Sequence, residues 1–258
     1  MEYLVSLLRQ LMRILAVPME KPPMFGSFHI ACALLLCVTA PAAGYALRRK
    51  TDAQRLRVIH AAGWILLAGE ILKQLFLFFI VEHELYNWWW FPFQLCSMPM
   101  YLSILLPHLE NRDGVIVFLT SYCLIAAVLA LIYPQDMLRE YVFLTGHAFV
   151  WHGIMLVIAF TLLFGHMVRF ENRNFVQAFL LFLFLAGIAE CINIYGYHHT
   201  VIPGTYPNMF YITPYYKNTQ PVFRRVADTC GILPADILYL LTLSAGSFLL
   251  FLAEKRLS

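Results

Sequence analysis

The sequence predicts an all-α, polytopic membrane protein: a helical bundle of about seven transmembrane helices with an interfacial amphipathic helix at its amino terminus. Three observations support this prediction. Of the 258 residues, 61% are hydrophobic and only 13% are charged. The mean hydropathy is +0.69, which a water-soluble domain with a polar surface does not reach. Apolar runs of about 20 residues, the length that crosses a bilayer as a helix, recur along the chain.

Residues 1–20 form the predicted interfacial helix. Leucines at three- and four-residue spacing lie on one face of this helix, and Arg9 and Arg13 lie on the other. A signal peptide is the competing interpretation. Two arginines interrupt the apolar stretch, however, and no small-residue cleavage site precedes Pro18, so the pattern favours a helix in the membrane interface.

The transmembrane domain is predicted to occupy residues 27–253. Connections within it are short, except for a polar, aromatic and proline-rich loop at 196–234. A loop of this length is either a lid or binding surface, or an ordered connector. The predicted spans are 27–47, 58–81, 88–106, 114–133, 141–164, 175–195 and 235–253.

Basic residues predict the orientation of the bundle. Ten Lys and Arg residues flank the spans on the side of the first loop and the carboxyl terminus, and seven flank the other side. The positive-inside rule therefore places the amino terminus outside and the carboxyl terminus in the cytoplasm. The net charge of +3 is small and lies in short loops, so nucleic acid is not an expected partner.

The cysteine pattern argues against structural cross-links. The six cysteines include no CxxC pair and no Cys/His cluster at zinc-like spacing. We therefore expect no disulfide framework, no metal site and no cofactor.

The stretch 88–106 holds the candidate nucleophile, Cys96. Pro92 is predicted at the first helical position, which places Cys96 just beyond the first turn, near the positive end of a helix that favours a thiolate. Pro99 is predicted to bend this helix and to leave the carbonyl of Leu95 without a donor. The competing interpretation is a small, inert, buried thiol.

Polar side chains within the predicted spans are the other candidates, because ionisable groups in hydrocarbon are costly. Counted from one side of the membrane they lie between about 3 and 18 Å deep, with Cys96 at about 12 Å, so one cavity can contain them all. Glu70 and Lys73 share a helix face and form either a structural ion pair or part of a site. His147 and His152 are about 140° apart around a helix, so only one can be the base for the thiol, and hydrogen bonds to neighbouring helices are the alternative role. The supporting or substrate-binding candidates are Gln94, Glu70, Lys73, His147, Glu190 and Asn193.

Four segments occur in the order of a known family's markers. FPFQLCSMPMYL is similar to a Leu-Pro-Leu-His-Leu-Cys segment, and WHGIMLVIAF contains a His-Gly marker. GTYPNMFYI is similar to an Asn-Tyr-Met segment, and GILPADILYLL to a closing Gly-Pro-Trp-Pro helix. Over residues 58–252 the chain thus resembles the YwaF-like integral membrane protein family, the transmembrane protein 164 family.

The resemblance implies an integral membrane acyltransferase or acyl hydrolase, located in a bacterial plasma membrane, with a membrane phospholipid as acyl donor or acceptor. It implies that Cys96 forms a thioester acyl-enzyme and that His152 is its base. Gln94 stands where the family commonly has histidine. The residue types agree with this chemistry, because an imidazole can activate a thiol for attack on an ester.

A transporter or channel is the alternative from another class. It would use Glu70, Lys73 and Glu190 as a proton or ion relay and would keep its activity without Cys96. A histidine-box hydroxylase is set aside, because only His198 and His199 are adjacent.

Overall fold

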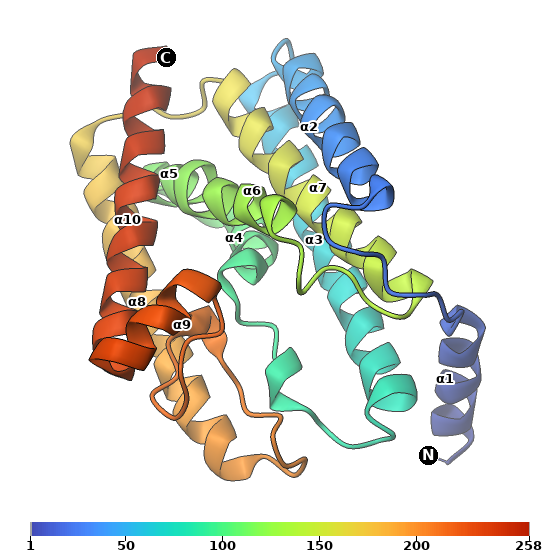
Figure 1. Cartoon of the computed structure of the whole chain (residues 1–258). Helices are drawn as coiled ribbons and strands as arrows, with labels where there is room; N and C mark the ends of the chain where they lie inside the picture. Colours follow the sequence, from blue (N-terminus) through green and yellow to red (C-terminus); the bar gives the residue numbers. More distant parts are fainter. Residues whose placement is uncertain (1, 258) are drawn as a thin grey trace.

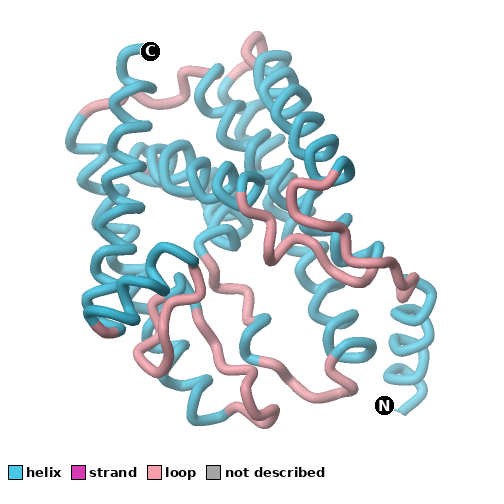
Figure 2. The backbone as a smooth tube through the Cα atoms, viewed as in Figure 1, coloured by secondary structure: helices cyan, strands magenta, loops and turns pink. Residues whose placement is uncertain are grey.

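The computed structural model describes residues 2–257, and it confirms the all-α membrane class (Figure 2). Six helices in the described chain are long and apolar enough to cross a membrane. Two of them contain a π-helical turn, η1 in the second and η5 in the third. The six are α2 Ser27–Leu47, α3 Asp52–Phe76 with η1 Leu77–Val81, α5 Asp113–Phe118 with η5 Leu119–Cys123 and α6 Leu124–Ile132, α7 Val142–Phe164, α8 Asn172–His199, and α10 Ile232–Leu257.

Figure 1 shows that the α2–α3 turn, the α7–α8 connection and the carboxyl terminus lie at one end of the bundle. The amino terminus and the loop after α8 lie at the other end. A hydrogen bond of 2.9 Å from Lys255 Nζ to Asn172 Oδ1 joins α10 to the start of α8 at the first end. The basic residues 48–50 and Arg169 are in the connections at this same end.

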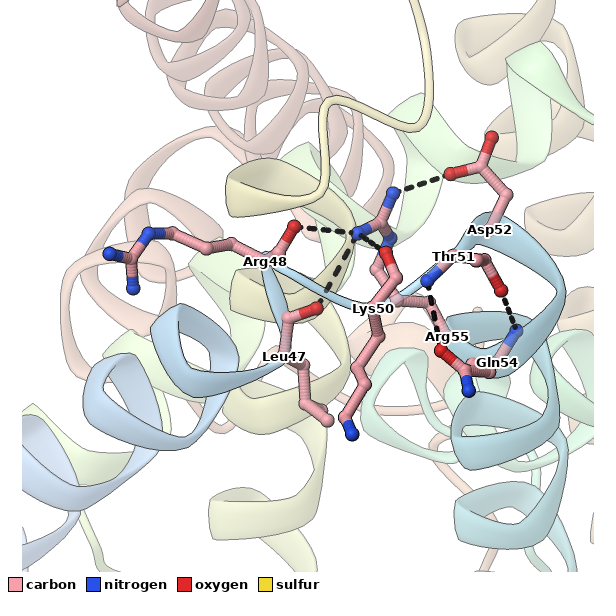
Figure 3. Close-up of polar contacts among 7 residues, drawn as sticks. All are labelled: Leu47, Arg48, Lys50, Thr51, Asp52, Gln54 and Arg55. Atoms are coloured by element: carbon pink, nitrogen blue, oxygen red, sulfur yellow. Dashed lines mark hydrogen bonds and ion pairs between the residues drawn. The ribbon is translucent and has the colours of Figure 1, made fainter.

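The turn between α2 and α3 is built around the side chain of Arg55 (Figure 3). Its guanidinium donates to the carbonyls of Arg48 and Lys50, which follow the end of α2, and it pairs with the carboxylate of Asp52. The helix α3 begins at Asp52, six residues before the predicted span, because Thr51 and Gln54 form a capping box. The buried arginine therefore satisfies carbonyls that the helix end leaves without donors.

Helix α7 is the centre of the bundle, and twelve of its residues are buried. It packs against α2, α3 and α6. Helices α2 and α7 touch at Gly44, where a Cβ atom would lie 2.6 Å from the Cβ atom of Phe160. Only glycine permits this approach, so Gly44 fixes how closely the two helices pack.

The segment α5–η5–α6 runs across the molecule between α10 and α7 (Figure 1). It carries the aromatic part of the core. The rings of Tyr122 and Phe182 stack with their centroids 4.5 Å apart, and the ring of Phe118 also stacks with Tyr122, at 5.4 Å. These contacts hold α8 against the crossing segment.

The predicted span 88–106 is not one helix, and its two proline predictions are corrected. The chain forms the 3₁₀ turn η2 Trp88–Trp90, then an extended stretch, then the 3₁₀ turn η3 Leu95–Ser97, the short helix α4 Met98–Leu105 and the 3₁₀ turn η4 Leu106–His108. Pro92 precedes the helix. Pro99 lies in the first turn of α4, where a missing N–H costs nothing, so it starts the helix and does not bend it. The carbonyl of Leu95 is not vacant, since the N–H of Met98 donates to it.

The first helix, α1 Glu2–Leu15, packs against η1 through the buried side chain of Met12. Arg9 pairs with Glu84, with 2.6 Å between Nη2 and Oε1. An isolated antiparallel bridge joins Pro18 to Tyr141, and so ties the segment after α1 to the start of α7.

The predicted loop 196–234 begins inside α8, which continues to His199. The loop contains the 3₁₀ turn η6 Met209–Tyr211 and the amphipathic helix α9 Pro221–Cys230. Lys217 donates to Asp228 across 2.7 Å, and this hydrogen bond lowers the pKa of the Asp228 carboxyl. The loop therefore has structure of its own, and hydrogen bonds to η6 from Gln94 and Asn193 join it to the bundle.

Candidate functional site

Cys96, the predicted nucleophile, lies in a tight turn of residues 94–97, which we call the nucleophile turn after that prediction. The N–H of Ser97 donates to the carbonyl of Gln94 across 2.8 Å, which closes the turn. The carbonyl of Cys96 accepts a hydrogen bond of 2.8 Å from the indole Nε1 of Trp151 on α7. Backbone and side chain thus hold the half-buried cysteine against the middle of the central helix.

His152 follows Trp151 directly and is 7% exposed. Its Nδ1 lies 2.7 Å from the carbonyl of Ala148. A carbonyl can only accept, so the network assigns the proton of the neutral ring to Nδ1 and leaves Nε2 with a lone pair. A ring in this state is a proton acceptor. Among residues 2–257, no hydrogen bond joins its Nε2 to the thiol of Cys96.

Glu70 and Lys73 on α3 form the ion pair that their spacing predicts, with 2.8 Å between Oε2 and Nζ. Gln74 completes the group, since its Nε2 donates to Glu70 across 2.7 Å and to the carbonyl of Trp90 across 2.6 Å. The Lys73 ammonium lies 6.0 Å from the centroid of the Trp151 ring. Helix α3 is therefore connected to both the stretch before the nucleophile turn and the indole that holds that turn.

His147 lies on α7 about one turn before Trp151, and the two rings are 5.4 Å apart. It faces α3 at Gly69, where a Cβ atom would lie 3.5 Å from its Nε2. This Nε2 is buried and has no hydrogen-bond partner among the described residues. His147 thus lies beside the Glu70–Lys73 pair, on a different face of α7 from His152.

Gln94 and Asn193 both hold the η6 turn. The amide of Gln94 donates to the carbonyl of Asn208 (2.8 Å) and accepts from the N–H of Phe210 (2.9 Å). The amide of Asn193, on α8, donates to the carbonyl of Met209 (3.1 Å) and accepts from the N–H of the same residue (2.6 Å). Phe210 has a positive φ of 55°, which a phenylalanine rarely adopts. The two amides stabilise this backbone and join it to the nucleophile turn.

Glu190 lies on α8 one turn before Asn193, and one of its carboxylate oxygens is buried without a hydrogen-bond partner in the described chain. No ion pair or hydrogen bond connects it to Glu70 or Lys73 within residues 2–257. The structure thus brings Glu70, Lys73 and His147 together around Trp151, and places Asn193 with Gln94 at η6. Glu190 takes no part in the Glu70–Lys73 group and lies beside Asn193 on α8.

Comparison with known proteins matches residues 24–252 to the model of the TMEM164 family. The chain belongs to the TMEM164 family. The match runs from just before α2 to residue 252 in α10, and so includes the nucleophile turn, the His147–His152 stretch of α7 and the η6 turn. No curated protein and no solved structure gave a match.

Two parts of this site in the TMEM164 family member were not identified from the sequence. Trp151 is the first residue of the WHGIMLVIAF segment, and its buried indole N–H needs an acceptor, which is a signal of a contact with another helix. Asn208 lies within the GTYPNMFYI segment, and its Oδ1 accepts from the N–H of Thr213 across 3.1 Å inside the loop. Among the described residues, no group of three or more His, Cys, Asp and Glu side chains is placed to hold a metal ion.

Proposed function

We propose that this member of the TMEM164 family is an acyltransferase or acyl hydrolase acting on membrane glycerolipids, with Cys96 as nucleophile and His152 as general base. The observation that carries the proposal is the hydrogen bond from Trp151 to the carbonyl of Cys96. It fixes the nucleophile turn against α7 at the residue next to His152. His152, a candidate base whose Nε2 has an available lone pair, therefore lies on α7, the helix that contacts the turn of Cys96.

The first step transfers the acyl group to sulfur. Nε2 of His152 takes the proton of the Cys96 thiol, and the thiolate attacks the carbonyl carbon of a glycerolipid ester. The C–S bond forms, the bond from carbon to the glycerol oxygen breaks, and the imidazolium returns the proton to that oxygen. The products of this step are a lysolipid and a thioester on Cys96.

The second step reverses these roles. An acceptor hydroxyl or a water molecule loses its proton to Nε2 of His152 as its oxygen attacks the thioester carbon. The C–S bond breaks and the sulfur recovers the proton. A lipid hydroxyl gives transfer, and water gives hydrolysis.

No hydrogen bond joins the thiol to Nε2 among the described residues, so this chemistry requires the sulfur to move toward the imidazole when substrate binds. Rotation about the first side-chain bond moves a cysteine sulfur between staggered positions without moving the backbone. Catalytic hydrogen bonds are commonly long before substrate binds.

The developing oxyanion needs a donor, and Lys73 is the candidate among the residues that the sequence suggested for this role. The amides of Gln94 and Asn193 are both already engaged at η6. Their hydrogen bonds support the backbone of the η6 turn. The Lys73 ammonium remains close to Trp151, which holds the nucleophile turn.

The test is whether an acyl-enzyme forms at all. Purified full-length protein incubated with phosphatidylcholine is expected to gain the mass of one acyl chain, and hydroxylamine is expected to remove it as it does a thioester. Peptide mapping is expected to find the acyl group on the Cys96 peptide. An adduct on Cys123, which lies in the same buried cluster, would reverse the assignment, and no adduct would reject the proposal.

We further propose that the end of the bundle with the carboxyl terminus faces the cytoplasm, because the basic α2–α3 turn lies there. Cys230 is exposed at the end of α9, just before α10 begins at the opposite end. In intact cells, a membrane-impermeant maleimide is expected to label Cys230. Labelling of Cys230 only after permeabilisation would reverse the orientation.

A further inference from the structure

An apolar groove of about 360 Å³ lies between α3 and the chain on both sides of the nucleophile turn. Its first wall is a stripe of α3, with Leu67 and Ile71 one helical turn apart and Phe78 further along in η1. Its second wall contains Pro92 and Met100, which lie four residues before and four residues after Cys96. The volume is within the usual range of small-molecule sites.

The groove opens toward the bilayer. Ile71 is 54% exposed, and Trp64, seven residues earlier on the same face of α3, is 51% exposed. Because α3 is a candidate membrane span, this face meets hydrocarbon and not water. An occupant of the groove therefore comes from the lipid phase.

The charged and amide groups that line the groove already have partners within the protein, so they leave no charge for a ligand to neutralise. The Glu70 carboxylate is already paired with Lys73 and with Gln74. The hydroxyl of Tyr101 donates to the carbonyl of Pro92 across 2.9 Å. The hydroxyl of Tyr86, which also lines the groove, is a neutral group. With Glu70, Gln74 and Tyr101 satisfied in this way, the groove is complementary to a neutral hydrocarbon chain and not to a charged headgroup.

We propose that this groove binds one acyl chain of a bilayer phospholipid and holds it beside the nucleophile turn. Its role as the donor-chain site rests on the proposed function, whereas the binding of lipid does not. Both walls adjoin the site, since Gln74 donates to the carbonyl of Trp90 and Met100 lies two residues after the start of α4, four residues beyond Cys96. A chain in the groove therefore runs along the segment that carries Cys96.

Photo-crosslinking tests the binding without requiring catalysis. The full-length Cys96→Ala protein is reconstituted in phosphatidylcholine vesicles that contain a small fraction of phosphatidylcholine with a diazirine on its sn-2 chain. After irradiation, we expect the lipid to be attached to Met100, which is 1% exposed, at least as often as to Val38 of α2, which is 69% exposed. Annular lipid alone would label Val38 and not the buried methionine.

Two tryptophan substitutions on α3 give matched variants. In the Cys96→Ala background, Ile71→Trp places an indole ring in the groove. We expect the yield of the Met100 cross-link to fall about tenfold, because the groove would lose most of its affinity for the acyl chain. Ile65→Trp adds the same ring on a different face of the same helix, at a residue that is 59% exposed, and is expected to leave the cross-link unchanged.

Two results would overturn the inference: labelling of Met100 no stronger than background, or equal labelling of Met100 in the two tryptophan variants. Either result would mean that the groove is empty or is covered by a second copy of the chain. If Met100 is cross-linked but no thioester forms in the unsubstituted protein, the proposed function fails and the lipid site stands. If the thioester forms on Cys96 but Met100 is not labelled, the function stands and the acyl chain binds elsewhere.

Discussion

The Cys96→Ala protein is expected to form no acyl thioester with phosphatidylcholine, under conditions in which the unsubstituted protein is acylated. Alanine keeps the backbone of the nucleophile turn and its carbonyl, so the hydrogen bond from Trp151 is retained. Only the sulfur is removed, and without it no C–S bond can form. Intact-mass spectra over a time course measure the loss directly.

Cys123→Ala is the matched control, because Cys123 is another thiol of the same core cluster and is 2% exposed. We expect its acyl adduct to form as in the unsubstituted protein. The removal of a single buried sulfur is a small change in volume, and both variants should retain a cooperative thermal transition in detergent. A Cys96→Ala protein that is still acylated would remove the basis of the enzymatic proposal.

The His152→Ala protein is expected to acylate Cys96 about 10²- to 10⁴-fold more slowly, the range that general-base catalysis contributes. A hydrogen bond from Nδ1 to the carbonyl of Ala148 holds the ring of His152. The alanine substitution removes this ring and with it the lone pair of Nε2. The initial rate of thioester formation is the measurement. Added imidazole is expected to restore part of that rate, which it would not do if the histidine only supported the fold.

His147→Ala is the comparison for the identity of the base. His147 lies on another face of α7 and contacts α3 at Gly69, so its loss should slow acylation less than the loss of His152. A larger effect at His147, with recovery by imidazole in that variant, would move the base to His147. It would also make the α3 face of α7, and not the face of His152, the site of proton transfer.

The sequence predicted the long helices because each is an apolar run of about 20 residues with few charges, and membrane spans need little else to be recognised. The same reasoning failed for residues 88–106. Their apolar character is that of a span, but Pro92 and Pro99 are compatible either with a bent helix or with a helix that starts late. The structure has the second form, and the backbone groups released by the break are satisfied by Trp151 and Gln74 from other helices.

The polar residues were found from the sequence, but their partners were not. Spacing on one helix predicted the contact between Glu70 and Lys73, because residues three apart share a face. Depth in the membrane predicted that Gln94 and Asn193 lie near the site, yet it could not show that both bind the backbone of η6. Such contacts join segments more than ten residues apart, and local periodicity carries no information about them.

The junction between Gln94 and η6 has a consequence for biosynthesis. Gln94 bonds to Asn208 and Phe210, which the ribosome adds more than a hundred residues later. A nascent chain that has inserted only as far as α7 already contains both Cys96 and His152, but the turn that bears the sulfur lacks this support. On the proposed function, reactivity toward lipid would thus be acquired only once synthesis has passed η6, so incomplete chains released into the membrane would remain inert.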